Sequence, residues 1–193
     1  MLASGHYEHG RRRNAMSLVI RPCLDSDIGE VAVIYAHHVT TGLASFELAP
    51  PSAAEMALRR KEVLARGLPY FVAELDGVVA GYSYANAYRA RPAYRFTVED
   101  SIYVRRDYAG RGVGAALLPA LIDACTQADC RQMLAVIGDR ANAASIGLHQ
   151  RFGFAHVGLL PAVGFKFGRW VDSVLMQRAL GAGDSRQPGE DIA

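Results

Sequence analysis

Three glycines within five residues constrain this chain more than any other feature. The stretch "RDYAGRGVGAALL" (106–118) places Gly110, Gly112 and Gly114 directly before an apolar helical run. A glycine inside a helix or strand costs about 0.5–1 kcal/mol relative to alanine, so this cluster indicates a sharp turn or a close approach to a ligand. A glycine-rich turn that opens a helix also exposes backbone N–H groups at the positive end of the helix dipole, which suits a phosphate or pyrophosphate. We favour anion binding over the alternative that the glycines only pack the helix closely.

The spacing of these glycines also matches the G-x-G-x-x-A form of a dinucleotide fingerprint, at residues 110–115. A Rossmann fingerprint follows the first strand of its domain directly and has an acidic residue about 20 positions later. Here "RRDYA" separates the preceding strand from the glycines, and three predicted strands come earlier. A P-loop is excluded as well, because no Gly-Lys-Ser/Thr occurs. The context therefore disfavours nucleotide binding of either type.

The order of apolar patterns along the chain predicts an α/β fold with a mixed sheet. "SAAE" (52–55) has capping-box spacing, and the pair Asp76-Gly77 predicts a hairpin turn. Strands are expected at 17–22, 70–75, 78–85, 94–104, 132–138, 154–160 and 170–180. Helices are expected at 25–42, from 52 to before 67, from the glycines to about 128, and at 142–153. We expect one domain over 17–180, a flexible N-terminal extension over 1–16 and a flexible C-terminal tail over 181–193.

The charge of the chain argues against nucleic acid or a membrane surface as its partner. The net charge is only +2 over 193 residues, and the one basic run, "RRR" at 11–13, lies in the polar N-terminal stretch. No apolar run is long enough to span a membrane, and the N-terminus lacks a signal-peptide pattern. These features predict a cytoplasmic protein.

The cysteines and the paired histidines do not predict a metal site. Cys23, Cys125 and Cys130 are odd in number and lack zinc-like spacing, so we expect reduced, mostly buried thiols. His37 and His38 have no ligand spacing with any acid, which predicts surface histidines or histidines with hydrogen-bond partners. We therefore expect no metal.

The strand "FTVEDSIYV" contains two adjacent acids, Glu99 and Asp100. Neighbouring side chains of a strand point to opposite faces, so one carboxylate is expected towards solvent and the other half-buried. A wet sheet face would also explain such a pair. Glu99 is the better catalytic candidate, because the glycine loop follows it closely in sequence.

Three blocks in this order and spacing resemble the GNAT superfamily of acetyl-CoA-dependent N-acetyltransferases. They are "TVEDSIYVRRDYAGRGVGAALL" (97–118), "NAASIGLHQRFGF" (142–154) and "GFKFGRWVDSVLMQ" (164–177). Within the superfamily they are most similar to the phosphinothricin and methionine sulfoximine acetyltransferases, over about residues 18–180. The resemblance implies a mixed, mostly antiparallel sheet with a splayed central strand pair flanked by helices. It also implies acetyl-CoA as cosubstrate and a homodimer with its substrate pockets near the subunit contact.

The resemblance assigns roles residue by residue. Glu99 would be the general base, and His149 stands where many members have a tyrosine that protonates the departing thiolate. The residues implied for acetyl-CoA are Ile102, Tyr103 and Val104 for the pantetheine, Gly110, Arg111, Gly112, Val113, Gly114 and Ala115 for the pyrophosphate, and Asn142 for the distal part. The residues implied for the amine substrate are Phe46, Arg89, Arg91, Glu99, Asp100 and Ser101.

Some positions depart from the family pattern or stay open. Position 109 is Ala109, where the superfamily usually has Gln or Arg, and position 167 is Phe167, where some phosphinothricin enzymes have a histidine. Because the loop would bind phosphate through its backbone, we expect Ala109 to be tolerated. Lys166 and Trp170 fit a pocket rim or an interface as readily as core packing.

The resulting prediction is an enzyme that acetylates the α-amine of a small amino-acid analogue. Phosphinothricin, methionine sulfoximine and methionine sulfone are the first candidate substrates, with herbicide resistance as one consequence. Arginine side chains suit the anionic groups of such substrates, and Arg89, Arg91 and Arg95 precede the catalytic strand. The alternatives are a GNAT enzyme for another amine, namely an amino acid, polyamine, aminoglycoside or protein N-terminus, and a non-catalytic acyl-CoA sensor.

Overall fold

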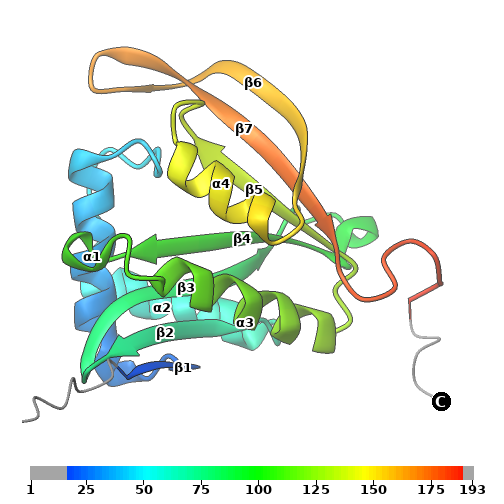
Figure 1. Ribbon diagram of the computed structural model, residues 1–193, viewed down its shortest axis with the longest axis horizontal. Helices are drawn as coiled ribbons and strands as arrows, with labels where there is room; N and C mark the ends of the chain where they lie inside the picture. The colour runs from blue at the N-terminus through cyan, green and yellow to red at the C-terminus, as the bar shows by residue number, and fades with distance from the viewer. Residues whose placement is uncertain (1–16, 189–193) are drawn as a thin grey trace, which may run out of the picture.

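A seven-stranded sheet with helices on both faces organises residues 17–188, the part of the chain that the computed structural model describes (Figure 1). The strand order is β1-β2-β3-β4-β5-β7-β6, and β4–β5 is the parallel pair among otherwise antiparallel neighbours. The strands are β1 Leu18–Pro22, β2 Tyr70–Leu75, β3 Val78–Ala87, β4 Thr97–Val104, β5 Gln132–Gly138, β6 Ala155–Lys166 and β7 Arg169–Ala179. The helices are α1 Ile28–Thr41, α2 Ala53–Ala65, α3 Val113–Gln127 and α4 Ala143–Arg151. The predicted mixed α/β architecture is confirmed.

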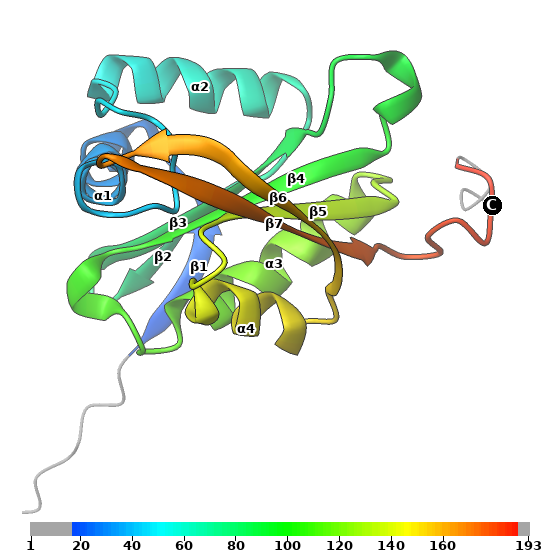
Figure 2. The ribbon, with the colours of Figure 1, turned by 90° about the horizontal axis from the view of Figure 1, so that it is seen from above.

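The four helices divide between the two faces of the sheet (Figure 2). Helices α1 and α2 cover one face, where Val31 and Val39 of α1 pack with Tyr82 of β3. Helices α3 and α4 lie on the other face, where Leu118 of α3 packs with Met133 and Met176 of the central strands. Each fully buried side chain of this size contributes roughly 1.5–3 kcal/mol, so both helical layers are held by apolar burial. The two methionines are core residues, as predicted.

The central strands separate after a short parallel contact. Strand β4 pairs with β5 only at Thr97, Val98 and Glu99, whereas on its other edge β4 stays paired with β3 as far as Val104 opposite Gly81. One edge of residues 100–104 therefore faces a gap in the sheet instead of a neighbouring strand. This gap is the splayed central pair that the resemblance implied.

Two strands differ from the sequence prediction in length. Strand β4 begins at Thr97, because residues 92–94 form a 3-10 turn that opens with Pro92. Strand β6 runs to Lys166 and joins β7 through the two-residue turn Phe167-Gly168. Both turn residues have positive φ, 50° and 74°, as a tight type I′ hairpin turn requires. Sequence reasoning missed this turn, because phenylalanine is an unusual residue at positive φ.

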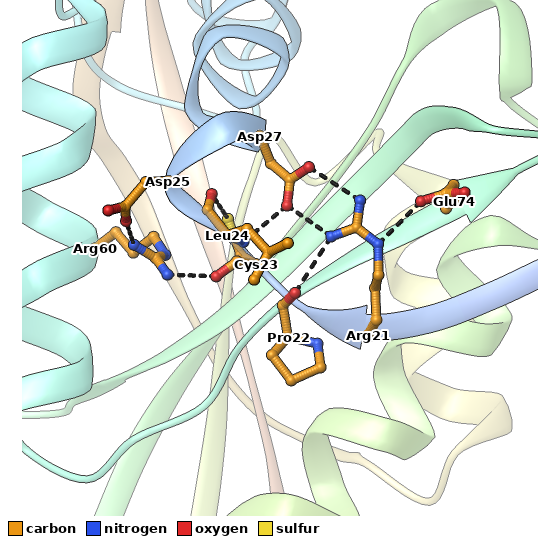
Figure 3. A network of polar contacts seen from close by, with 8 residues as sticks. All are labelled: Arg21, Pro22, Cys23, Leu24, Asp25, Asp27, Arg60 and Glu74. Carbon is orange, nitrogen blue, oxygen red and sulfur yellow. Dashed lines mark hydrogen bonds and ion pairs between the residues drawn. The ribbon is translucent and has the colours of Figure 1, made fainter.

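A polar network fixes the connection between β1 and α1 (Figure 3). Arg21 donates two hydrogen bonds to Asp27, at 2.7 and 2.9 Å, and a third to Glu74 of β2 at 2.9 Å. The hydrogen bonds from Arg21 hold the pKa of the buried Asp27 carboxyl below its usual range. Arg60 of α2 donates to the Cys23 carbonyl and to Asp25, and so ties the same connection to the second helix. This network lies outside the site described below and serves the fold.

Several remaining expectations concern the termini, the thiols and membrane crossing. The predicted extension over 1–16 and the end of the predicted tail, 189–193, lie outside the described residues, while residues 181–188 follow β7 in turns. The thiols of Cys23, Cys125 and Cys130 are free and buried. None of the helices within residues 17–188 combines the length and hydropathy of a membrane span.

Candidate functional site

A cavity of about 830 Å³ opens where β4 and β5 separate. Its walls come from α1, the loop before α2, β4, the glycine loop, the end of β5 and α4. The predicted site residues among its lining are Phe46, Glu99, Asp100, Ser101, Ile102, Tyr103, Val104, Gly110, Gly112, Val113, Gly114, Ala115, Asn142 and His149. The fold thus brings Phe46 and residues of two sequence blocks, 97–118 and 142–154, to one cavity.

The glycine loop has the backbone geometry of an anion site. Gly110 and Gly112 have φ of 74° and 82°, in the left-handed region that glycine adopts without a steric penalty. Gly112 is the N-cap of α3, and no side-chain hydrogen bond caps this end of the helix. The first N–H groups of an α-helix lack partners within the helix, so those of α3 are available to a phosphate.

The third glycine, Gly114, is explained by close packing between helices. A Cβ on Gly114 would lie 3.2 Å from Leu148 Cδ2 of α4 and 3.8 Å from Val104 Cγ2 of β4. Gly114 therefore allows α3 to approach α4 closely, while Gly110 and Gly112 provide the turn. These observations support the turn and the close packing, and anion binding by the loop stays a prediction.

His38 holds the end of β4 from the α1 side. Its Nε2 atom lies 2.9 Å from the Val104 carbonyl oxygen, and because a carbonyl can only accept, Nε2 carries the proton. Burial lowers the pKa of His38, which favours the neutral ring. The prediction of a histidine with a hydrogen-bond partner is confirmed, but sequence reasoning missed that His38 lines the cavity.

Glu99 reaches the cavity from the last residue of the parallel β4–β5 contact. Its pKa is raised, first by burial of the carboxylate and second by the negative charge of the adjacent Asp100. A carboxylate with a raised pKa is a stronger base than an ordinary one. Glu99 therefore combines the position and the chemistry of a proton acceptor.

Asp100 and His149 form a buried pair beside it. His149 Nε2 lies 3.0 Å from Asp100 Oδ2, and the side chains are 5% and 2% exposed. Burial lowers the pKa of His149, but the hydrogen bond and charge of Asp100 outweigh burial, so the net shift is upwards. We expected Asp100 as a substrate-binding residue, whereas the structure engages one of its oxygens with His149. The expected half-buried carboxylate is Glu99, whereas the expectation of a solvent-facing one is wrong, because Asp100 is buried.

The loop between α1 and α2 forms the wall that contains Phe46. This ring packs on two glycines, since a Cβ on Gly164 would lie 2.4 Å from Phe46 Cε2 and one on Gly138 would lie 3.2 Å from Phe46 Cε1. The buried Lys166 of β6 donates to the Ser45 carbonyl oxygen at 2.6 Å, and burial lowers its pKa. Lys166 therefore supports the loop from the core. Trp170, the other residue left open by the sequence, is 66% exposed.

The same loop is held from α1 by Tyr35. The Tyr35 hydroxyl lies 2.9 Å from Ser45 Oγ and donates to Glu47 Oε1 at 3.0 Å. Arg59 of α2 donates to the same Glu47 oxygen at 2.5 Å. Sequence reasoning missed Ser45 and Glu47 as cavity residues, because neither belongs to a recognisable motif.

The predicted arginines lie elsewhere. Arg89 and Arg91 are exposed and do not line the cavity, and Arg89 packs on the Tyr88 ring at 5.0 Å. Arg111 is exposed over the Tyr108 ring at 5.2 Å and is also absent from the lining. Among residues 17–188 the ionisable side chains that line the cavity are acids, histidines and tyrosines, with no arginine or lysine. Substrate contacts by Arg89 and Arg91 stay a prediction.

Metal ligation has no support in the described part of the chain. Residues 17–188 contain no group of three or more histidine, cysteine or acidic side chains that could hold a metal ion.

The fold and the site together define a class of protein. A splayed strand pair, a helix capped by glycine and a cavity with a half-buried acid between them are typical of acyl-CoA-dependent N-acyltransferases. The left-handed glycines and the uncapped start of α3 fit the pyrophosphate of such a cofactor, and the open edge of β4 fits its pantetheine.

Comparison with known proteins gives the family. The acetyltransferase (GNAT) family profile matches residues 37–154, and this chain belongs to that family. Phosphinothricin N-acetyltransferase of Alcaligenes faecalis is 54% identical over 169 residues, which are 88% of this chain and 86% of the relative. L-methionine sulfoximine/L-methionine sulfone acetyltransferase of Pseudomonas aeruginosa is 39% identical over 84% of this chain and 94% of its own length.

A relative of known structure was solved with acetyl-CoA bound. The crystal structure of a phosphinothricin acetyltransferase from Sinorhizobium meliloti, in complex with acetyl-CoA, matches with a TM-score of 0.87 and 46% identity. The match covers 91% of this chain and 95% of that structure. The chain is thus an acetyl-CoA-dependent acetyltransferase of the GNAT family.

Proposed function

We propose that this enzyme acetylates the α-amine of small amino-acid analogues, with phosphinothricin, methionine sulfoximine and methionine sulfone as the first candidates. The observation that carries the proposal is the half-buried Glu99 of raised pKa at the point where β4 and β5 part. The 54% identity to a protein named phosphinothricin N-acetyltransferase supports this substrate class.

The cavity provides a binding surface for acetyl-CoA along its length. The exposed edge of β4, at Ile102, Tyr103 and Val104, offers backbone groups to the pantetheine. The N–H groups of the glycine loop and of the first turn of α3 hold the pyrophosphate, with Arg111 nearby. Asn142 caps α4 through Oδ1, which accepts from Ser145 N at 3.2 Å, and its Nδ2 group remains as a donor for the distal part.

The reaction requires a neutral amine beside the thioester that acetyl-CoA supplies. An amino-acid ammonium is mostly protonated at neutral pH, and Glu99 accepts its proton, directly or through water. A positioned base of this kind contributes typically ~10²–10⁴-fold to the rate. Backbone N–H groups at the splayed strand stabilise the developing oxyanion. The ring of His149 lines the same cavity, and its positive charge stabilises the thiolate that leaves during acetyl transfer.

An arginine or lysine suits the recognition of an anionic substrate, and the cavity lining within residues 17–188 contains neither. We propose that Arg89 or Arg91 provides it in a homodimer, with Phe46 as the apolar wall and Ser101 as a hydrogen-bonding group. The β6–β7 hairpin supports a dimer, because its exposed side chains form an apolar strip. These side chains are Val157, Leu159, Leu160, Val163, Phe165, Phe167 and Trp170. Such strips mark interaction sites.

Dimerisation is tested by light scattering on the purified chain and on a Phe165→Glu, Trp170→Glu double variant. We expect the wild type to have twice the mass of its monomer and the variant to be monomeric with an increased KM for the amine. A monomeric wild type would contradict the dimer. We further propose a cytoplasmic enzyme whose activity confers herbicide resistance, which growth on phosphinothricin with and without the gene would test.

The substrate class is tested by acetyl-CoA-dependent thiol release. The amines are the three candidates, spermidine and an aminoglycoside, and the proteins are the wild type, Glu99→Gln and Asp123→Asn. Asp123 is an exposed acid on α3 outside the cavity, so its variant controls for loss of a carboxylate. We expect turnover of the three candidates, reduced about 10²-fold or more by Glu99→Gln alone. Turnover of only spermidine or the aminoglycoside would overturn the substrate class, and acetyl-CoA binding without any turnover would favour a sensor.

A further inference from the structure

The buried pair of Asp100 and His149 has a defined proton arrangement, whose meaning for catalysis rests on the function proposed above. His149 Nδ1 lies 2.7 Å from the Ser145 carbonyl oxygen, and Nε2 lies 3.0 Å from Asp100 Oδ2. Because a carbonyl oxygen can only accept, Nδ1 carries a hydrogen. Nε2 then either donates to an ionised Asp100 or accepts from a protonated one.

Two features favour the arrangement in which His149 Nε2 donates to an ionised Asp100. An aspartate is a far weaker base than an imidazole in water, by more than two pKa units, so the shared proton belongs on the ring. His149 also lies in the last turn of α4, where the helix dipole favours a cation. Both features point to a doubly protonated His149 beside a carboxylate.

We propose that Asp100 is a positioning residue, which holds His149 as an imidazolium of fixed orientation and places a permanent negative charge beside Glu99. Both N–H groups of His149 are then engaged, with Ser145 and with Asp100. His149 therefore acts on the reaction through its positive charge, and releasing a proton requires breaking the hydrogen bond to Asp100. The charge of Asp100 also makes Glu99 a stronger base.

The titratable groups around this pair come from four elements. His149 faces Asp100 from α4, Glu99 adjoins it on β4, and the thiol of Cys125 lies within reach of its charge from α3. Tyr84 of β3 faces Glu99. Among these groups the imidazolium is the one cation, so removing the charge of Asp100 acts first on His149 and second on Glu99.

The first test observes His149 directly in the ligand-free protein. Nitrogen-15 NMR of the histidine-labelled chain reports which ring nitrogens carry a proton, and the His149 signals are identified by their loss in His149→Gln. We expect both nitrogens to be protonated at pH 7 in the wild type. Asp100→Asn keeps the shape and a hydrogen bond but removes the charge, so the titration of His149 should move to lower pH. Asp123→Asn should leave it unchanged.

A neutral His149 at pH 7 in the wild type would overturn the proposal, and so would an unchanged titration in Asp100→Asn. Because the wild-type spectrum requires no variant of Asp100, it decides the question even if Asp100→Asn fails to fold. It is also independent of turnover, so it separates this proposal from the proposed function. Loss of the Glu99 role in the Glu99→Gln assay would leave the NMR result standing.

The second test is the pH dependence of kcat/KM. In Asp100→Asn we expect both the acidic limb, set by Glu99, and the alkaline limb, set by His149, to move to lower pH. The kcat should fall roughly 10- to 100-fold, at or below the usual effect of one acid–base group. A residue that only supports packing would lower activity at every pH without moving either limb, and that result would contradict the positioning role.

Discussion

Replacing Gly164 with alanine tests whether the Phe46 wall depends on a glycine outside the cavity. Gly164 is buried in β6 and does not line the cavity. A Cβ there would lie 2.4, 2.7 and 2.8 Å from three atoms of the Phe46 ring, whereas ordinary contact begins at 3.4 Å. The ring is 37% exposed, so it can leave its place more easily than the strand can move. We expect the variant to fold with the ring displaced.

The magnitude follows from the cost of overpacking. An added methyl group that a packed site cannot accept costs about 1–3 kcal/mol. For a chain of this size each kcal/mol lowers Tm by about 2–4 °C, so Gly164→Ala should lower Tm by about 2–12 °C. Gly147→Ala is the matched control, because a Cβ on this residue of α4 meets nothing within 4 Å. It should gain about 0.5–1 kcal/mol from helix propensity.

The assay combines calorimetry with steady-state kinetics. Loss of one or two kcal/mol of contact with the amine corresponds to a rise in its KM of about 5- to 30-fold. The KM for acetyl-CoA should stay unchanged, because the three atoms nearest to the added Cβ belong to Phe46 and none belongs to the glycine loop or the β4 edge. A rise in both constants would indicate general disruption instead.

A double-mutant cycle with Phe46→Ala tests this packing argument. Phe46→Ala removes the ring atoms that the new Cβ would meet, so Gly164→Ala should cost much less stability in that background. If the two substitutions were additive, or if Gly164→Ala changed neither Tm nor the KM for the amine, the packing argument for this wall would be wrong.

The remaining predictions concern the Arg21–Asp27 ion pair, the Ser52 N-cap and the glycine loop. Asp27→Asn should lower stability by about 1–3 kcal/mol at pH 7. The pKa of Asp27 is depressed in the folded chain, so its contribution is present above the unfolded value of about 3.9 and disappears as pH falls. Denaturant unfolding should show the difference from wild type vanishing in acid; a constant difference would contradict it. Ser52→Ala removes the N-cap hydrogen bond to Glu55 N, at 3.2 Å, and should cost about 0.5–2 kcal/mol in the same assay. Gly112→Ala must adopt a φ of 82°, at a cost of about 1–2 kcal/mol, and should raise the KM for acetyl-CoA but not for the amine. An unchanged KM for acetyl-CoA would argue against pyrophosphate binding at this helix start.

Local features of the sequence predicted the elements and the cofactor end of the site. Gly110 and Gly112 indicated a sharp turn, and Ser52 indicated the start of α2, because each signal depends on residues a few positions away. The β6–β7 turn was missed for the same reason: Phe167 adopts a conformation that its own type does not favour, and strand pairing on both sides holds it there.

The sequence by itself determined the α/β class, the glycine-capped helix, the two candidate catalytic residues and, through three ordered blocks, the family. Only the tertiary structure decided that Asp100 pairs with His149, 49 residues away, and that Lys166 supports Ser45 across 121 residues. It also decided that Arg89 and Arg91 lie outside the cavity. Backbone conformation and capping depend on residues close in sequence. These contacts join residues that are distant in sequence, and they depend on the splay of β4 from β5 and on the path of the β6–β7 hairpin. No local sequence pattern encodes either of these features.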